Sequence, residues 1–297
     1  MAAIKRVGVV GAGLMGSGIA QVTATAGFDV VVRDVDEAAI GRGRGAIEKS
    51  LAKFVEKGKL AADARDATLG RLAFTTDLGQ IAPCDLVIEA VTEDLELKNG
   101  LWRELDAAAG PGTIFASNTS SLTIAAMAAV TKRQDRFVGL HFFSPVQLMP
   151  LVEVVRTVTT SDAAFRAAFE FARAIGKEPI AAKDSAGFVV NLLLVPFMLD
   201  AVRALERGVA SVEDIDKGMK LGCNHPMGPL TLIDFTGVDI CYKVAEIMFA
   251  EFRETRYAPP PLLKRLVLLG HLGRKTGRGF YDYSGEAPVP ADLGLQV

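Results

Sequence analysis

A histidine and a glutamate embedded in apolar sequence are the residues whose types and spacing first suggest chemistry. His141 lies in FVGLHFF and Glu153 lies twelve positions later in LVEVVR, and both stretches are typical of buried strands. The SP dipeptide after the first stretch predicts a turn, so the histidine is expected near the end of one strand and the glutamate early in the next. A carboxylate bonded to one ring nitrogen would fix the tautomer and leave the other nitrogen to accept a proton. The pair therefore predicts general acid–base catalysis.

A structural role for this histidine is the competing interpretation. A lone buried histidine is more often satisfied by a backbone carbonyl than used in catalysis. The preference reverses if a hydride carrier binds nearby, because removing hydride from an alcohol carbon also requires removing the hydroxyl proton, and imidazole titrates near neutral pH. The other histidines, His225 and His271, lie in loop-like sequence without an evident carboxylate partner, so structural roles are expected for them.

The N-terminal segment carries the signature of a binding site for such a carrier. VGVV, residues 7–10, predicts a short strand that leads directly into GAGLMGSGIAQ, with Gly11, Gly13 and Gly16 in GxGxxG spacing. The motif needs a sharp turn at the first glycine, close approach of a pyrophosphate at the second, and a tightly packed helix from the third. Leu14 and Met15 complete the expected cofactor-contacting segment. A sharp turn without a ligand is the structural alternative.

The next predicted strand supports the nucleotide interpretation. FDVVVRD ends in Asp34, eighteen residues beyond Gly16, where a carboxylate is expected to meet the hydroxyls of the adenosine ribose. This position favours NAD, because a carboxylate would repel the ribose phosphate of NADP. Arg33 and Arg42 leave NADP open, since either could reach that phosphate.

The elements that must position these residues alternate strand and helix. CDLVIEAV and TIFASN, residues 84–91 and 113–118, predict buried parallel strands separated by an amphipathic helix. The segment that follows, SNTSSLTI, offers Ser120 and Ser121 either as caps of the next helix or as hydrogen-bond partners of a substrate oxygen. The residues alone favour neither role.

A long, charged, helix-prone stretch over residues 37–72 interrupts this rhythm. Within it, Ser50, Lys53 and Lys57 are spaced three and then four residues apart, so they share one helix face that could meet a phosphate-bearing group. On spacing alone, a solvated helix face is the better interpretation.

Composition predicts a two-domain protein of a reducing cytoplasm. The chain has 297 residues, 50% of them hydrophobic, and a formal net charge of −2, which gives no general attraction to nucleic acid or to an anionic membrane. No apolar run approaches the ~20 residues of a membrane span. Three widely spaced cysteines without CxxC spacing argue against a disulfide framework and a metal site.

Two domains are expected, a nucleotide-binding domain over residues 1–184 that contains the helical insertion, and a helical domain over residues 185–297. The second domain begins with a helix around NLLLVPFML, which is apolar on all sides and contains Pro196. Such a helix is expected to be buried on every side, as it would be if it packed against a second subunit.

Together the motifs resemble the 3-hydroxyacyl-CoA dehydrogenase family, especially its short bacterial-type 3-hydroxybutyryl-CoA dehydrogenases. The resemblance covers nearly the whole chain and rests on segments in the right order: GAGLMGSGIAQ, VIEAVTEDLELK, ASNTSSL, GLHFFSPV, LVEVV, GFVVN, EDIDKGMKLGCNHPMGPL and GRKTGRGFYDY. It implies a Rossmann-type α/β dinucleotide-binding domain followed by an all-α C-terminal domain that forms a homodimer. It also implies reversible oxidation of an (S)-3-hydroxyacyl-CoA with NAD, with NADP left open.

The resemblance further implies roles by matching position. His141 corresponds to the catalytic base and Glu153 to its orienting partner, while the groups that hold the substrate oxygens are Ser120 and Asn191. The positions implied to contact the nucleotide, besides the glycine motif, are Asp34, Glu93, Lys98, Ser120, Ser144 and Lys275. The positions implied to contact CoA are Ser50, Lys53, Lys57 and Ser120. For the first three, this implied role replaces the interpretation as a solvated helix face.

Two positions depart from the family pattern. The family more often has Asn at Ser144, near the nicotinamide, where the shorter hydroxyl could still hydrogen-bond through water. It often has Arg where this chain has Leu192, so a contact made by that arginine is not expected. Two functional alternatives remain: a dehydrogenase of the same fold acting on a free hydroxy or sugar acid or on 3-hydroxyadipyl-CoA, and a nucleotide-binding sensor without turnover.

Overall fold

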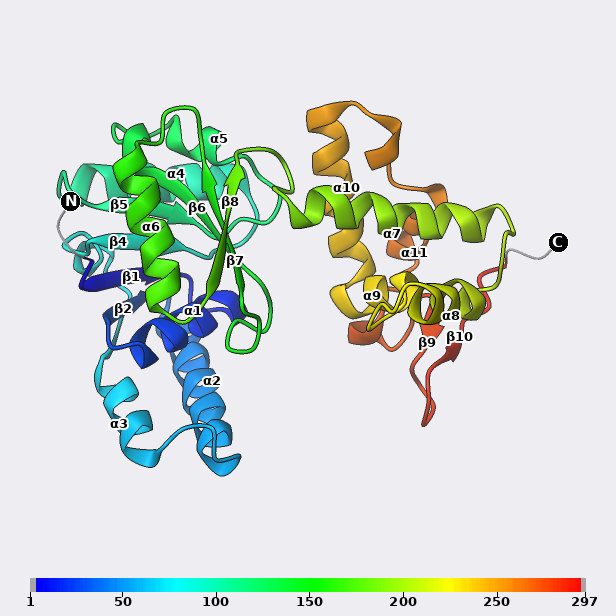
Figure 1. Cartoon of the computed structure of the whole chain (residues 1–297), viewed down its shortest axis with the longest axis horizontal. Coiled ribbons are helices and arrows are strands. Elements are labelled where there is room, and N and C mark those ends of the chain that lie inside the picture. The colour runs from blue at the N-terminus through cyan, green and yellow to red at the C-terminus, as the bar shows by residue number, and fades with distance from the viewer. Residues whose placement is uncertain (1–3, 295–297) are drawn as a thin grey trace. The chain divides into compact units, whose positions relative to one another are not determined.

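The computed structural model describes residues 4–294, which form two compact units (Figure 1). The first unit ends at Phe188 and the second begins at Val189. The first is an α/β unit built on one sheet, and the second is mainly helical. The predicted order, an α/β domain followed by a largely helical domain, is confirmed.

The sheet of the first unit has the strand order β3-β2-β1-β4-β5-β6-β7-β8. The strands from β3 to β6 are parallel, β7 is antiparallel to β6, and β8 is parallel to β7. The order reverses direction between β1 and β4, which is the switch point where open α/β sheets bind ligands. The strands are β1 (Arg6–Val10), β2 (Asp29–Arg33), β3 (Leu72–Thr75), β4 (Leu86–Glu89), β5 (Ile114–Ser117), β6 (Phe137–Phe142), β7 (Leu151–Arg156) and β8 (Glu178–Lys183).

Helices cover both faces of this sheet because its strands are apolar on both faces. Alternate residues serve different cores: Val7 and Val9 pack with one group of helices, whereas Val10 packs with the other. The first group is α1 (Leu14–Thr25), α2 (Glu37–Glu56), α3 (Ala62–Gly70) and α6 (Asp162–Ala174), and the second is α4 (Leu95–Ala108) and α5 (Ile124–Ala128). The long charged stretch of the sequence is therefore the pair α2 and α3, between β2 and β3.

Side-chain caps fix where several helices begin. The carboxylate of Asp36 accepts from the Ala39 amide at 2.7 Å to start α2, and Asp94 accepts from the Leu97 amide at 2.9 Å to start α4. Each cap satisfies a backbone N–H that the helix itself leaves unpaired. Helix α5 is capped differently, from a distant residue, as described below.

The second unit consists of helices and a short ribbon of two-residue strands, so it is not entirely helical. Its elements are α7 (Val190–Glu206), α8 (Val212–Gly222), α9 (Pro229–Thr236), α10 (Val238–Phe252), α11 (Pro261–Leu268), β9 (Tyr281–Asp282) and β10 (Val289–Pro290). Helix α7 contains Pro196 and buries Val195, Met198 and Leu199, but Leu193 is 65% exposed. The expectation that this helix is buried on every side is thus not met within the single chain.

Two buried carboxylates connect the elements of the second unit. Asp216 of α8 accepts from the backbone amides of Leu230 and Thr231, at 2.8 and 2.9 Å, and from the hydroxyl of Tyr281 at 3.0 Å. The second carboxylate is that of Asp234 in α9, and it accepts hydrogen bonds from residues of the GRKTGRGFYDY motif.

Asp234 accepts from the Phe280 and Tyr281 amides at 2.9 Å each and from the Tyr283 hydroxyl at 3.0 Å. A Cβ at Gly279 would lie 2.0 Å from this carboxylate, so only glycine permits the approach. Burial raises the pKa of Asp234, although these donors oppose the shift. The tyrosines of the motif therefore serve structure by hydrogen bonding as well as by packing.

Among residues 4–294, none of the helices combines the length and apolarity needed to cross a membrane.

Candidate active site

The glycine motif forms a cradle at the carboxyl end of β1. Gly11 has a φ of +104°, a conformation that favours glycine, and makes the turn out of the strand. A Cβ at Gly16 would lie 1.7 Å from the Gly11 carbonyl oxygen, so the third glycine allows α1 to pack against the turn. At Gly13 a Cβ would meet nothing within 4 Å, which leaves open space at the start of the helix.

This open space fits a phosphate-bearing group. Gly13 is the N-cap of α1, no side chain caps the helix, and its first turn holds no acidic residue. Free backbone N–H groups and the helix dipole both favour an anion there. Leu14, which is 77% exposed, and half-buried Met15 lie in the same first turn.

Asp34 lies next to the cradle, directly after β2. One oxygen of its carboxylate accepts from the Ala12 amide of the glycine loop at 2.6 Å, and the other accepts from the Val35 amide at 2.6 Å. Arg33 donates its Nε to the Thr76 carbonyl at 3.2 Å, while Arg42 is exposed on α2. The carboxylate thus joins the ends of two neighbouring strands at the edge where the cradle opens.

His141 and Glu153 face each other across β6 and β7. They are directly paired in the antiparallel register, so their side chains project from the same face of the sheet. The His141 Nδ1 lies 2.6 Å from a Glu153 carboxylate oxygen, and both side chains are buried. The predicted pairing of these two side chains is confirmed. The contact with Glu153 therefore involves Nδ1 and not Nε2.

Two phenylalanines pack on the imidazole. The Phe143 ring lies 4.5 Å from it and the Phe188 ring 5.6 Å, measured between centroids. Phe188 adopts a φ of +50°, directly after Gly187 at +80°, which is rare for a bulky residue. The sequence analysis did not identify either aromatic residue as part of the site, because their contacts with the histidine are not visible in a local pattern.

The loop after β5 is fixed by Glu93. One oxygen of this carboxylate accepts from the backbone amides of Ser120 and Ser121, at 3.1 and 3.2 Å, and from the hydroxyls of Thr119 and Ser121. Burial acts to raise the pKa of Glu93, but Lys98 and these hydroxyls outweigh it, so the pKa lies below its usual range. The half-buried Ser120 is therefore held on an ordered loop.

This loop is also joined to the strand that carries the histidine. The Asn118 side-chain oxygen accepts from the Phe142 amide, next to His141, at 2.9 Å. The backbone N–H of Asn118 in turn donates to the backbone carbonyl of Glu89 in β4 at 2.8 Å. The ends of β4, β5 and β6 thus form one connected edge.

Beneath the loop lies a buried ion pair that the sequence analysis missed. Lys98 of α4 donates to Glu89 at 2.6 Å and lies 3.1 Å from Glu93, and the Lys98 and Glu89 side chains are only 1% and 0% exposed. The Ser117 hydroxyl donates to the other Glu89 oxygen at 2.6 Å. A glutamate inside the otherwise apolar run DLVIEAV was the available signal, because a buried carboxylate requires a partner.

The N-terminus of α5 shows that one of the two interpretations of Ser120 and Ser121, as caps of this helix, is wrong. Neither Ser120 nor Ser121 caps this helix; its Ile124 and Ala125 amides donate to the two oxygens of Asp184, each at 2.7 Å. Asp184 lies about sixty residues away in sequence. The Ser121 hydroxyl instead donates to Glu93 at 2.9 Å.

The predicted CoA-contacting residues lie at the end of α2. Ser50 and Lys53 belong to the helix, and Lys57 is its C-cap. Both lysines are exposed and Ser50 is half-buried. The helix packs on the sheet unit through Ile40, Gly43, Ile47 and Leu51.

The remaining predicted residues lie in a loop of the first unit and in the second unit. Ser144 is exposed in the loop between β6 and β7. Asn191 and Leu192 lie in the first turn of α7, in the second unit. Lys275 also belongs to the second unit, where its ammonium lies 2.6 Å from a carboxylate oxygen of Asp239. The site of the first unit therefore contains the cradle, Asp34, Glu93, Lys98, Ser120, His141 and Glu153.

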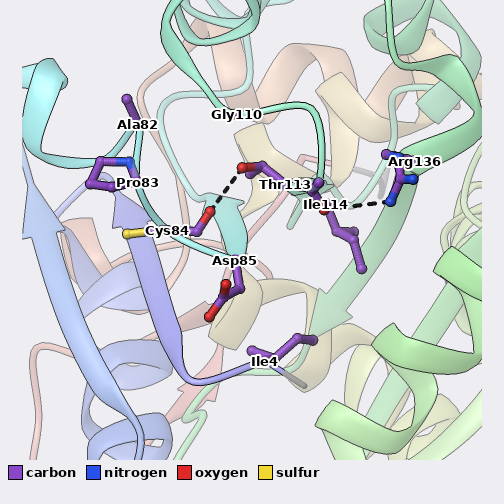
Figure 2. A pocket seen from close by; sticks show the side chains of 10 residues that line it. Ile4, Ala82, Pro83, Cys84, Asp85, Gly110, Thr113, Ile114 and Arg136 are labelled. Carbon is purple, nitrogen blue, oxygen red and sulfur yellow. Dashed lines mark hydrogen bonds between the residues drawn. The ribbon is translucent and has the colours of Figure 1, made fainter. Parts of the chain in front are cut away.

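A separate pocket of about 380 Å³ lies at the opposite edge of the sheet (Figure 2). Its lining includes Ile4, Asp85, Thr113 and Arg136, which lie at or just before the amino ends of β1, β4, β5 and β6. None of the predicted site residues lines it. Within residues 4–294, no group of three or more His, Cys, Asp or Glu side chains could hold a metal ion.

Comparison with known proteins assigns the chain to a family. A family model described as 3-hydroxyacyl-CoA dehydrogenase, NAD binding domain, matches residues 6–185, and one described as the C-terminal domain of the same family matches residues 187–283. The 3-hydroxybutyryl-CoA dehydrogenase of Mycobacterium tuberculosis is 52% identical over 283 residues, which cover 95% of this chain and 99% of the relative. The human mitochondrial hydroxyacyl-coenzyme A dehydrogenase is 46% identical over 287 residues, which cover 94% and 91%.

Solved structures agree. The (S)-3-hydroxybutyryl-CoA dehydrogenase of Ralstonia eutropha matches with a TM-score of 0.93 and 45% identity, covering 95% of this chain and all of that one. The family models, the relatives and the fold all lead to the same assignment. The chain belongs to the 3-hydroxyacyl-CoA dehydrogenase family and is an oxidoreductase that acts on a CH–OH group with an NAD-type dinucleotide.

Proposed function

We propose that the protein catalyses the reversible oxidation of an (S)-3-hydroxyacyl-CoA, with 3-hydroxybutyryl-CoA as the first candidate, to the 3-ketoacyl-CoA. The observation that carries this proposal is the buried contact of 2.6 Å between His141 and Glu153 at the end of β6. The names of the relatives at 46% to 52% identity support the substrate class. The bound dinucleotide supplies the chemistry of hydride transfer.

His141 is the proposed general base in oxidation. Its Nε2 takes the proton of the substrate hydroxyl, because Nδ1 is held by Glu153. The carboxylate orients the ring, selects the tautomer and stabilises the imidazolium that forms. In the reverse direction the same nitrogen returns the proton. The packing of Phe143 and Phe188 supports this role by restricting ring motion and water access.

Ser120 and Asn191 are proposed to hold the substrate oxygens. Hydrogen bonds from fixed polar groups stabilise negative charge that develops on an oxygen. The bond from the Ser120 amide to Glu93 at 3.1 Å supports the role of Ser120, because it fixes the loop before the substrate arrives. For Asn191, in the second unit, the support is its matching position in the GFVVN motif.

The cofactor is proposed to be NAD, held at Gly11, Gly13, Leu14, Met15 and Gly16. Asp34 would bind the adenosine ribose, and the negative charge of its carboxylate favours NAD over NADP. Further nucleotide contacts are proposed for Glu93, Lys98, Ser120, Ser144 and Lys275.

The CoA moiety is proposed to bind at Ser50, Lys53 and Lys57, with a further contact at Ser120. The exposure of both lysines supports a role in binding phosphate groups. We further propose a homodimer formed through the second unit, since Leu193 of the apolar helix α7 is 65% exposed in the single chain.

We also propose that the protein resides in a reducing cytoplasm, which suits its three free cysteines.

The proposed function is tested by mixing the protein with acetoacetyl-CoA and NADH and measuring the absorbance of the nicotinamide over time. Rapid oxidation of NADH with the thioester, and none with free acetoacetate, is expected. NADPH in place of NADH tests the cofactor preference. Silence with acetoacetyl-CoA and with longer and dicarboxylic 3-ketoacyl-CoAs would overturn the proposal and favour a free-acid dehydrogenase or a sensor without turnover.

A further inference from the structure

Three charged side chains form a cluster beneath the loop after β5, which we call the Glu89 cluster: Glu89, Lys98 and Glu93. The Lys98 ammonium lies 2.6 Å from a Glu89 oxygen and 3.1 Å from a Glu93 oxygen. The Glu89 and Lys98 side chains are 0% and 1% exposed, whereas the Glu93 side chain is 25% exposed. One cation is therefore shared by two carboxylates, and one of these carboxylates reaches the surface of the site.

The hydrogen bonds around Glu89 fix its charge. Its carboxylate accepts from the Lys98 ammonium, the Val91 amide at 2.9 Å and the Ser117 hydroxyl at 2.6 Å. The Ser117 oxygen also accepts from the Thr119 amide at 3.2 Å. Every one of these partners is a donor, as an ionised carboxylate requires. With all three groups ionised, the charge of the cluster sums to −1.

The order of the strands places this charge between the two functional ends of the site. The cradle follows β1 and His141 lies on β6, with β4 and β5 between them. Glu89 pairs in register with Val10, next to the cradle, and with Ser117, which pairs with Gly139 two residues before His141. A dinucleotide that begins at the cradle and presents its reacting ring at His141 must cross the ends of β4 and β5.

We propose that the Glu89 cluster shifts the relative affinity of the protein for the two cofactor forms toward the oxidised form. The inference rests on the proposed function. The nicotinamide ring is cationic when oxidised and neutral when reduced, so a net negative charge next to its path stabilises the oxidised form selectively. Glu89 acts in this as a specificity-determining residue that touches neither the cofactor nor the substrate. The low exposure of the cluster keeps its field from being screened by salt.

The experiment is calorimetric titration of the purified protein with NAD and, separately, with NADH, in the absence of acyl-CoA. Glu89→Gln removes one negative charge and brings the cluster to zero. The ratio of the NAD dissociation constant to that of NADH is expected to rise by roughly tenfold, which corresponds to one charge on the order of 10 Å away near a protein surface. Glu104→Gln, an equal charge change on the exposed face of α4, is the matched control and should leave the ratio unchanged.

A double variant separates charge from structural damage. Glu89→Gln combined with Lys98→Met removes more packing and hydrogen bonds than the single change, yet returns the net charge to −1. The ratio should therefore move back toward the wild-type value, although both affinities fall. Glu93→Gln provides a second test if Glu89→Gln does not fold, because its carboxylate is partly exposed, and it should raise the ratio in the same direction.

Unchanged ratios in folded Glu89→Gln and Glu93→Gln would overturn the inference, as would a double variant that departs further from wild type than the single one. These outcomes are distinct from failure of the proposed function. If the wild-type protein reduces acetoacetyl-CoA and the ratio does not respond to the cluster, only the inference fails. If the protein binds neither cofactor form, the proposed function fails as well.

Discussion

Both units bury carboxylates, but they surround them with different partners. In the first unit, Glu89 contacts the Lys98 ammonium and Glu153 contacts the His141 imidazole, both of which can carry a proton. In the second unit, Asp234 accepts only from backbone amides and a tyrosine hydroxyl. A carboxylate among donors that keep their protons fastens the fold, whereas one paired with a titratable base can take part in proton chemistry. Of these buried carboxylates, Glu153 belongs to the candidate active site and Asp234 to the scaffold of the second unit.

The most severe test of this contrast removes the titratable partner of a buried carboxylate. His141→Gln should lower kcat by about 10² or more, because the amide cannot accept the hydroxyl proton, while cofactor affinity changes little. The measurement is steady-state kinetics with acetoacetyl-CoA beside direct titration of NADH. His225→Gln is the matched control, since that ring only packs on Phe197 in the second unit. Full activity of His141→Gln would remove the basis of the contrast.

The next largest effect is expected from the scaffold carboxylate. Asp234→Ala leaves two backbone amides and the Tyr283 hydroxyl without their acceptor, so the free energy of unfolding should fall by about 2–4 kcal/mol. Denaturant unfolding measures it. Asp200→Ala, which breaks only a surface pair with Arg203, should cost about 0.5 kcal/mol or less. Equal losses in the two variants would show that Asp234 does not fasten the unit.

The third prediction compares the buried carboxylates with an exposed charge of the first unit, that of Lys57. Lys57 is solvent-exposed at the end of α2, so Lys57→Ala should leave stability unchanged and raise the KM for acetoacetyl-CoA by roughly three- to tenfold at low salt. Kinetics at low and high ionic strength provide the measurement, and Lys59→Ala is the nearby control. A KM that stays constant at low salt would count against CoA binding on this face.

The smallest expected effect is a pair of opposite pH dependences. The pKa of Glu93 is lowered, so its contribution to stability is present above the ordinary value of 4.5 and is lost as the pH falls through the lowered pKa. The pKa of Asp234 is raised, so its contribution is present below the ordinary value of 3.8 and is lost as the pH rises through the raised pKa.

The cost of Glu93→Gln should therefore be larger at about pH 6 than at about pH 4, and that of Asp234→Asn smaller, by on the order of 1 kcal/mol or less. Unfolding free energies of wild type and variants at both pH values provide the comparison. The same sign in both variants would contradict the different environments assigned to the two carboxylates.

The parts of the site that could be predicted from sequence are those encoded locally. Gly11 and Gly16 lie five residues apart on one turn, and their contact follows from the spacing alone. His141 and Glu153 are farther apart, but they lie on strands that are consecutive in the chain, and consecutive strands are usually neighbours in a sheet. The fold class followed from the same alternation of strand and helix.

The contacts that escaped prediction join elements far apart in the chain. Asp184 caps α5 from about sixty residues away, so the nearby serines were wrongly considered as caps. The Ser117 hydroxyl donates to Glu89 across 28 residues, and Phe188, which follows the last strand of the sheet, packs on His141. Local patterns cannot rank such contacts, because they depend on which strands become neighbours.

The position of Phe188 has a practical consequence for dissecting the protein. It is the last residue of the first unit, it is 2% exposed, and its ring lies against the imidazole of His141. A fragment that stopped at Asp184 would retain every strand and helix of the first unit and still expose the histidine on one side. Anyone who expresses the nucleotide-binding half alone, or grafts it onto a different partner domain, should place the junction after Phe188 and keep Gly187 with it.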